Sequence, residues 1–175
     1  MKVYYDTTAF AHFFLTNDGN HPYSPFTKKF ICITSPFTLE EFLFNFITRG
    51  KFANVFKNSI NDRVGKVADL VQFMAFFKVD PIDLDDLTSL FLSMVIRGLE
   101  KNILKTSTNN DGLDFYDCLH LSFALLADAV TLITCDKDFE KLTLIRDFIS
   151  AFKLRKIEIF EPDPNFDNKV RSIIF

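Results

Sequence analysis

The stretch Ala129-Val130-Thr131-Leu132-Ile133-Thr134 decides the fold, and it runs directly into Cys135-Asp136-Lys137-Asp138. Its apolar and β-branched residues, followed at once by acids, predict a strand that ends in carboxylates. A run of the same kind lies near the start of the chain, where Lys2-Val3-Tyr4-Tyr5 is stopped by Asp6. Parallel α/β sheets place their ligands at the carboxyl ends of their strands. We therefore expect Asp6 and Asp136 at the same edge of one sheet.

Between these two strands, helical and strand patterns alternate along the chain. We expect further strands over 30–34 and 156–160, and helices over 9–15, 38–50, 61–77, 87–104, 114–128 and 135–152. This alternation implies parallel pairing through crossover helices. The sequence thus predicts an α/β fold of three layers, a central parallel β-sheet flanked by helices, over residues 1–161, followed by a C-terminal tail over 162–175.

Composition narrows the classes of function. The chain has 175 residues, 48% of them hydrophobic, so it can bury one substantial core, and we assign its 23 phenylalanines to that core. A net charge of −3 argues against non-specific electrostatic binding of nucleic acid over the whole surface. A nucleic-acid partner must therefore be bound through local contacts at one site. The opening residues are not those of a signal peptide, and no apolar run is long enough to cross a membrane. We expect a soluble, cytoplasmic protein whose three spaced cysteines are buried thiols rather than metal ligands.

Several acidic residues lie at strand ends or among apolar residues, where acids are uncommon unless they are paired or bind a cation. Asp6, Asp136 and Asp138 follow strands, Glu41 lies in the first turn of a predicted helix, and Asp117 sits between apolar residues. Carboxylates that converge repel one another unless a cation is present, and Mg²⁺ or Mn²⁺ suits such oxygen ligands. A metal of this kind can support phosphodiester hydrolysis without a serine, cysteine or histidine nucleophile.

Four segments carry a resemblance to a known family. They are Asp6-Thr7-Thr8-Ala9-Phe10, Thr34-Ser35-Pro36-Phe37-Thr38-Leu39-Glu40-Glu41-Phe42, Phe115-Tyr116-Asp117-Cys118-Leu119-His120-Leu121-Ser122-Phe123-Ala124 and Leu132-Ile133-Thr134-Cys135-Asp136-Lys137-Asp138-Phe139. In this order they resemble the motifs of the PIN-domain nucleases, which include the VapC-like toxins of toxin–antitoxin pairs. The resemblance covers roughly residues 2–161.

The resemblance implies both a site and a reaction. It makes Asp6, Glu41, Asp117 and Asp136 catalytic, with Mg²⁺ or Mn²⁺ held by Asp6, Asp117 and Asp136 and with Asp138 as a further candidate ligand. It implies RNA as the substrate, and it allows an antitoxin protein and a second copy of the chain as partners. The segment between Glu41 and Asp117 is longer than in compact toxins, which leaves the toxin role open.

Each acid also has a structural interpretation. Asp6 can cap the following helix, Thr38-x-x-Glu41 fits a capping box, and Asp136 or Asp138 can cap the next helix. Asp117 has no evident capping role, which favours function. His120 follows Asp117 by one helical turn and can pair with it, although a histidine in such a place is more often a hydrogen-bonded packing residue than a catalytic base.

The sequence leaves further roles and functions open. Thr7 or Thr8 can bond a metal-bound water or simply cap a helix, and a basic rim is a candidate RNA contact, comprising Lys28, Lys29, Arg49, Lys51 and Lys137. The first hypothesis is a metal-dependent ribonuclease, and the second is a catalytically silent PIN-fold binding or scaffold module. An aspartyl phosphatase ranks last, because Asp6-Thr7-Thr8 lacks the second acid of Asp-x-Asp.

Overall fold

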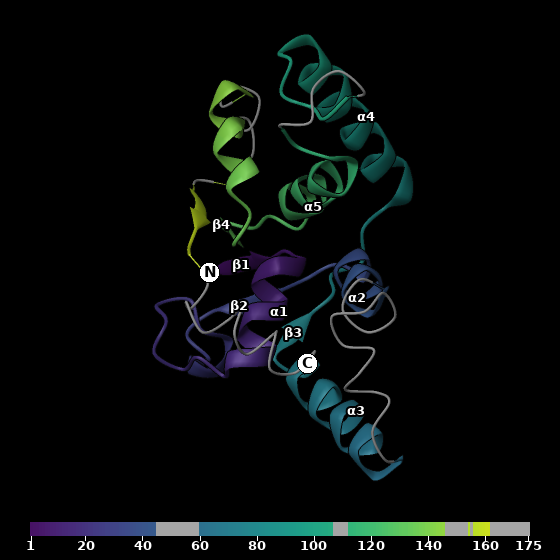
Figure 1. Ribbon diagram of the computed structural model, residues 1–175. Coiled ribbons are helices and arrows are strands. Elements are labelled where there is room, and N and C mark those ends of the chain that lie inside the picture. Colours follow the sequence, from purple (N-terminus) through teal and green to yellow (C-terminus); the bar gives the residue numbers. More distant parts are fainter. Residues whose placement is uncertain (45–59, 107–111, 146–153, 155, 162–175) are drawn as a thin grey trace.

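A five-stranded sheet forms the centre of the molecule (Figure 1). The structure is a computed structural model and describes residues 1–44, 60–106, 112–145, 154 and 156–161. The strands are β1 (Lys2–Tyr5), β2 (Ile31–Ile33), β3 (Phe77–Lys78), β4 (Thr131–Thr134) and β5 (Lys156–Ile159). All of them pair in parallel, in the order β3-β2-β1-β4-β5. The two strands that stood out in the sequence, β1 and β4, are therefore neighbours at the centre.

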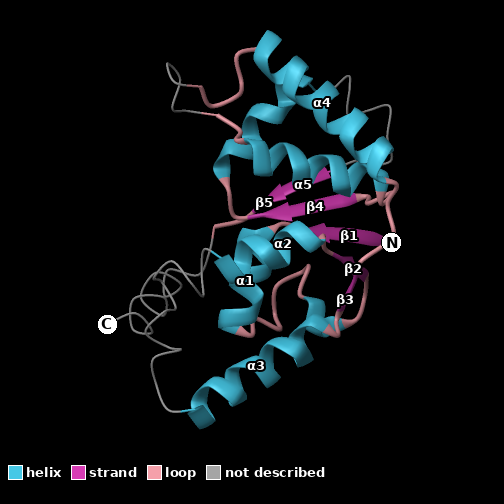
Figure 2. Cartoon of the chain, turned by 90° about the vertical axis from the view of Figure 1, so that its right-hand side faces the viewer, coloured by secondary structure: helices cyan, strands magenta, loops and turns pink. Residues whose placement is uncertain are grey.

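Helices cover both faces of the sheet, which confirms the predicted three-layer arrangement (Figure 2). They are α1 (Thr7–Thr16), α2 (Pro36–Glu41), α3 (Ile60–Met74), α4 (Leu84–Glu100) and α5 (Phe115–Leu126), with the 3-10 helices η1 (Pro25–Thr27) and η4 (Lys137–Ile145). The helices α4 and α5 pack on one face, and α1 and α3 on the other. Short α2 lies between α1 and α5.

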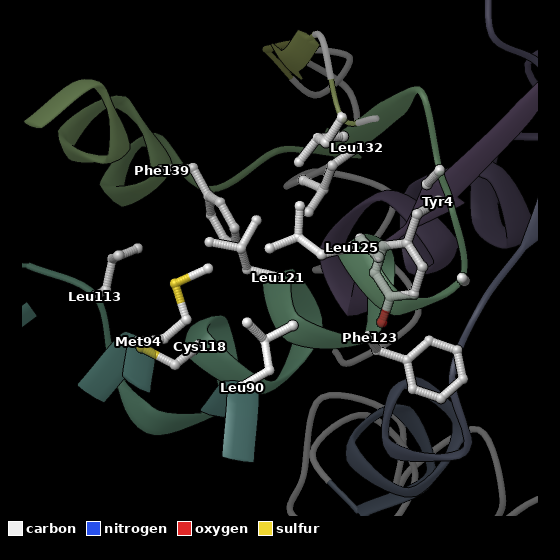
Figure 3. Close-up of a cluster of buried hydrophobic side chains, with 14 of the residues drawn as sticks. Tyr4, Leu90, Met94, Leu113, Cys118, Leu121, Phe123, Leu125, Leu132 and Phe139 are labelled. Carbon is white, nitrogen blue, oxygen red and sulfur yellow. The ribbon is translucent and has the colours of Figure 1, made fainter. Parts of the chain in front are cut away.

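The two cores follow from the alternation of side chains along β1. Tyr4 points into the core beneath α4 and α5, which Figure 3 shows, whereas Val3 and Tyr5 point into the core beneath α1. In the second core the ring of Phe10 lies 5.3 Å from that of Phe42 and 5.0 Å from that of Phe73. The phenylalanines of these clusters thus fill the core, as expected, and each buried ring contributes roughly 1.5–3 kcal/mol.

Two predicted elements differ in the structure, and two further predictions lie outside its described residues. The helix predicted to reach residue 77 ends at Met74, and Phe77–Lys78 forms the edge strand β3, which is too short to show a period-2 pattern. The helix predicted over 135–152 is the 3-10 helix η4 in its described part. The predicted helix end near residue 50 and the tail 162–175 lie outside the described residues.

The structure also bears on the expectations that the cysteines are buried thiols and that no segment crosses a membrane. Cys32 and Cys118 are buried, Cys135 is half-buried, and all three are free. No helix within the described ranges is long and apolar enough to cross a bilayer.

Candidate active site

Asp6 directly follows β1 and is also the N-cap of α1. Its Oδ1 accepts a hydrogen bond from the backbone N–H of Ala9 at 2.8 Å. The parallel register pairs Tyr5 with Ile133, which brings Asp6 beside Thr134, and the Thr134 hydroxyl donates to Asp6 Oδ2 at 2.5 Å. Burial raises the pKa of Asp6 above its ordinary value, against the opposing effect of these hydrogen bonds. The carboxylate that caps α1 thus also lies beside the end of β4.

Two threonines connect Asp6 to the segment after β4. Thr8 Oγ1 donates to Asp6 Oδ1 at 2.9 Å and accepts from the backbone N–H of Cys135 at 2.8 Å. Thr134 Oγ1, while donating to Asp6, accepts from the backbone N–H of Asp136 at 2.8 Å. Asp6 and Asp136 thus share Thr134 and lie at the same edge of the sheet.

Asp117 lies in the first turn of α5, and the expectation that it has no capping role was wrong. It forms a reciprocal capping box with Asp114: the N–H of Asp117 donates to Asp114 Oδ1 at 3.0 Å, and the N–H of Asp114 donates to Asp117 Oδ2 at 2.7 Å. Burial and then the charge of Asp114 raise the pKa of Asp117 to about 8. The charges of Asp136 and Asp6 act in the same direction. We call Asp6, Asp114, Asp117 and Asp136 the carboxylate cluster.

A lysine that the sequence did not single out lies beside this cluster. Lys105 Nζ is 2.8 Å from Asp138 Oδ2, while the backbone N–H of Asp138 donates to Asp136 Oδ1 at 2.8 Å. The hydrogen bond to Asp138, and after it the charges of Asp138, Asp117 and Asp114, raise the pKa of Lys105. Asp138 is thus engaged by a cation of the protein itself.

Lys105 is held there by a backbone contact rather than by a recognisable motif. Its N–H donates to the carbonyl of Leu113 at 2.9 Å, within a parallel bridge between Leu104 and Leu113. Gly112 makes this bridge possible, because at φ 149° an added Cβ would lie 2.2 Å from the carbonyl oxygen of Ile103. An isolated bridge leaves no periodic signal, which explains why the sequence did not reveal Lys105.

Glu41 is the last residue of α2 and not part of a first turn. The helix begins at Pro36, and its N-cap is Ser35, whose Oγ accepts from the N–H of Thr38 at 3.1 Å. The predicted capping box of Thr38 with Glu41 is therefore wrong, because the helix starts before Thr38.

The carboxylate of Glu41 is held by Thr7 and His120. The Thr7 hydroxyl donates to Glu41 Oε2, and His120 Nε2 lies 3.0 Å from the same oxygen. Burial alone would raise the pKa of Glu41, but the hydrogen bonds from His120 and Thr7 and the charge of His120 lower it below its ordinary value. His120 thus pairs with Glu41, and the predicted pairing with Asp117 was wrong.

The donor set fits a hard divalent cation in kind and in charge. All members of the carboxylate cluster offer oxygen, and like charges raise the pKa of Asp117, a repulsion that a bound cation relieves. As the side chains stand, no three acid, histidine or cysteine side chains of the described segments already surround a common metal position. Asp117 Oδ2, for example, accepts from the N–H of Asp114.

Of the described members of the predicted basic rim, two lie away from the cluster. Lys28 and Lys29 precede β2 and therefore lie at its amino end, at the sheet edge opposite Asp6. Lys137 pairs with Glu161 at 3.1 Å. Arg49 and Lys51 lie outside the described residues.

Comparisons with known proteins agree with this architecture. The family model of the PIN domain matches residues 3–144. Among solved structures, the chain is similar to one from the crystal structure of VapBC2 from Rickettsia felis bound to a DNA fragment from their promoter. The TM-score is 0.57 at 15% identity, over 89% of this chain and 98% of that one, so this likeness bears on the fold alone. No curated protein matches the sequence significantly.

Proposed function

This chain belongs to the PIN-domain family of nucleases, and from that premise we propose that it is a metal-dependent ribonuclease that hydrolyses phosphodiester bonds of RNA. The catalytic acids are Asp6, Glu41, Asp117 and Asp136. The observation that carries the proposal is the crowding of Asp6, Asp117 and Asp136 at the ends of β1, α5 and β4, where their charges raise the pKa of Asp117. Lys105 lies beside this cluster but is engaged by Asp138, and the charge of His120 only partly opposes the effect of burial on the pKa of Asp6.

Asp6, Asp117 and Asp136 would hold Mg²⁺ or Mn²⁺, with Asp138 as a further ligand if Lys105 releases it. A divalent cation there supplies polarisation of the phosphoryl oxygen and activation of a water molecule. Thr134 and Thr8 fix the orientation of the Asp6 carboxylate through their hydroxyls. Glu41, oriented by Thr7 and His120, positions the attacking water. Lys105, which lies beside Asp138, would supply a cation for a phosphate of the RNA backbone.

The resemblance to VapC-like toxins supports proposals about partners and location. We propose an antitoxin protein as a partner, a homodimer as the assembled state and the cytoplasm as the site of action. VapBC2, whose fold this chain shares, is a complex bound to DNA from its promoter. The solution mass would separate a monomer of 20.2 kDa from a dimer.

The ribonuclease is tested by incubating the protein with a mixed pool of single-stranded RNA in Mn²⁺, in Mg²⁺ and in chelator. We expect cleavage with metal, no cleavage with chelator and at least a hundredfold loss in Asp6→Asn and Asp117→Asn. Asp85→Asn, which removes the same charge from an exposed position on α4, serves as the matched control and should cleave like the wild type.

If the protein cleaves no RNA but still binds Mn²⁺ in a calorimetric titration, the result would favour the second candidate, a PIN-fold binding or scaffold module. The specific observation behind that candidate is that Asp6 and Asp117 both cap helices, so each has a structural role that does not require catalysis. Full activity in Asp6→Asn would contradict the ribonuclease proposal outright.

A further inference from the structure

A chain of buried hydrogen bonds links β1, α2 and α5 behind the candidate site. The hydroxyl of Tyr4 lies 3.0 Å from Ser35 Oγ and 2.8 Å from His120 Nδ1. Tyr4 and Ser35 are fully buried, and His120 is 2% exposed. Polar groups in such a place are costly unless they find partners, and here each one does.

The other ring nitrogen of His120 reaches the opposite end of α2. His120 Nε2 lies 3.0 Å from Glu41 Oε2 and 3.1 Å from Thr7 Oγ1. Ser35 is the N-cap of α2 and Glu41 is its last residue. The phenol of Tyr4 and the imidazole of His120 therefore bridge both ends of one helix.

This bridge matters because the α-helical part of this segment, α2, has only six residues and passes directly into a π-helical turn over 42–44. A helix of this length has little stability of its own, so its place depends on the side-chain contacts it makes. The last residue of α2 is Glu41, and the hydroxyl of Ser35 caps its first turn. Contacts at both ends fix the translation of the helix and its rotation about its axis.

We propose that Tyr4 and His120 are positioning residues, which fix the orientation of the Glu41 carboxylate by holding both ends of α2. The inference rests on the proposed nuclease function, because it assigns a role to Glu41 in that reaction. Both residues are buried, so the inference assigns neither of them a contact with the substrate. Tyr4 acts from β1 through Ser35 and through His120, and His120 acts directly on Glu41.

The test compares Tyr4→Phe with Tyr5→Phe, a control that the chain itself supplies. Both tyrosines are fully buried neighbours in β1, and both hydroxyls are hydrogen-bonded. The Tyr5 hydroxyl, however, donates to the backbone carbonyl of Tyr23 at 2.6 Å, in the core on the other face of the sheet. Each variant loses one buried hydroxyl, so stability falls by a similar amount, whereas only Tyr4→Phe releases α2.

We expect Tyr4→Phe to lower kcat by about 10–100-fold, the usual cost of removing a group that orients a site residue, with KM for RNA nearly unchanged. Tyr5→Phe should change kcat by less than about twofold. His120→Gln, which keeps an N–H donor for Glu41, should retain more activity than His120→Leu, which keeps none. If the wild type cleaves RNA and the two variants Tyr4→Phe and Tyr5→Phe have equal kcat values, the positioning inference is wrong while the proposed function stands.

A wild type that cleaves no RNA would instead overturn the proposed function. The bridge is then decided by the ¹⁵N resonances of the His120 imidazole. Both ring nitrogens should shift in Tyr4→Phe and in Glu41→Gln and stay in place in Tyr5→Phe. Resonances that do not respond to Tyr4→Phe or to Glu41→Gln would show that the bridge is absent.

Discussion

At the scale of single residues, Asp117 lies in an environment that disfavours its own charge. It is 8% exposed and lies close enough to Asp114, Asp136 and Asp6 for their charges to raise its pKa. Because this pKa is about 8 in the fold and about 4 in an unfolded chain, protonation of Asp117 stabilises the folded state. That contribution is complete below about pH 4 and is lost as the pH rises through 8.

We therefore expect Asp117→Asn to be more stable than the wild type at pH 8 in chelator. The amide oxygen can still accept from the N–H of Asp114, so the capping box survives. A gain of about 1–2 kcal/mol would raise the melting temperature by roughly 4 °C. Thermal unfolding at pH 5 and pH 8 measures the effect, with Asp85→Asn as the control. A melting temperature at pH 8 equal to or below that of the wild type would contradict the assigned environment.

Thr134 supports two acids with one hydroxyl. It donates to Asp6 and accepts from the N–H of Asp136, and it is fully buried. Thr134→Val, which is nearly isosteric, should lower the free energy of unfolding by about 1–3 kcal/mol, because Asp6, the N–H of Asp136 and the Thr8 hydroxyl each lose a hydrogen-bond partner. Thr134→Ser should recover most of that loss. Urea unfolding in chelator tests this, with Thr131→Val in the same strand for comparison, and equal losses in the two valine variants would refute it.

Some of these residues could be placed from sequence and others could not. Asp6 and Asp136 follow strands, and parallel pairing alone brings strand ends to one edge. The partner of His120 was missed because helical spacing offers Asp117, one turn away, whereas Glu41 is 79 residues distant in the chain. Only the packing of α2 against α5 makes that pair.

Among the elements, the bridge between Leu104 and Leu113 sets where α5 begins. It carries Lys105 on one side, and the residue after Leu113 is Asp114, the N-cap of α5. Gly112 adopts φ 149° within it, next to the carbonyl of Ile103.

Gly112→Ala should destabilise the protein by about 1–3 kcal/mol, because its Cβ would strain both the dihedral and the contact with Ile103. Gly19→Ala is the matched control, since nothing lies within 4 Å of its added Cβ, and it should change stability by less than about 0.5 kcal/mol. Denaturant unfolding of the two variants measures the difference. Similar midpoints for both would mean that the bridge is not strained by a side chain.

Sequence patterns located long elements better than short ones. Helix α5 and strand β4 have clear periodicities, and both were found close to their bounds. The two-residue strand β3 has no period, and its pairing with Cys32 and Ile33 depends on the neighbour strand. The start of α2 was placed two residues late, because Thr38 offered a second capping pattern beside that of Ser35.

At the scale of the whole molecule, binding of a divalent cation should raise the free energy of unfolding. Mn²⁺ at about 100 times its Kd should add roughly 2.7 kcal/mol, or about 5–10 °C in melting temperature for a chain of this size. Asp6→Asn should abolish the gain and Asp85→Asn should keep it, as measured by thermal unfolding with Mn²⁺ and with chelator. A gain of the same size in Asp6→Asn would place the cation elsewhere on the molecule.

The neighbouring strands β1 and β4 come from opposite ends of the domain, since Tyr5 pairs with Ile133. A ribosome that has synthesised the first hundred residues has therefore released Asp6 but not its partner Thr134 or the acid Asp136. The carboxylate cluster is absent from every nascent chain until nearly the whole domain has been translated. A fragment that ends before β4 lacks Thr134 and Asp136 and therefore cannot assemble the carboxylate cluster.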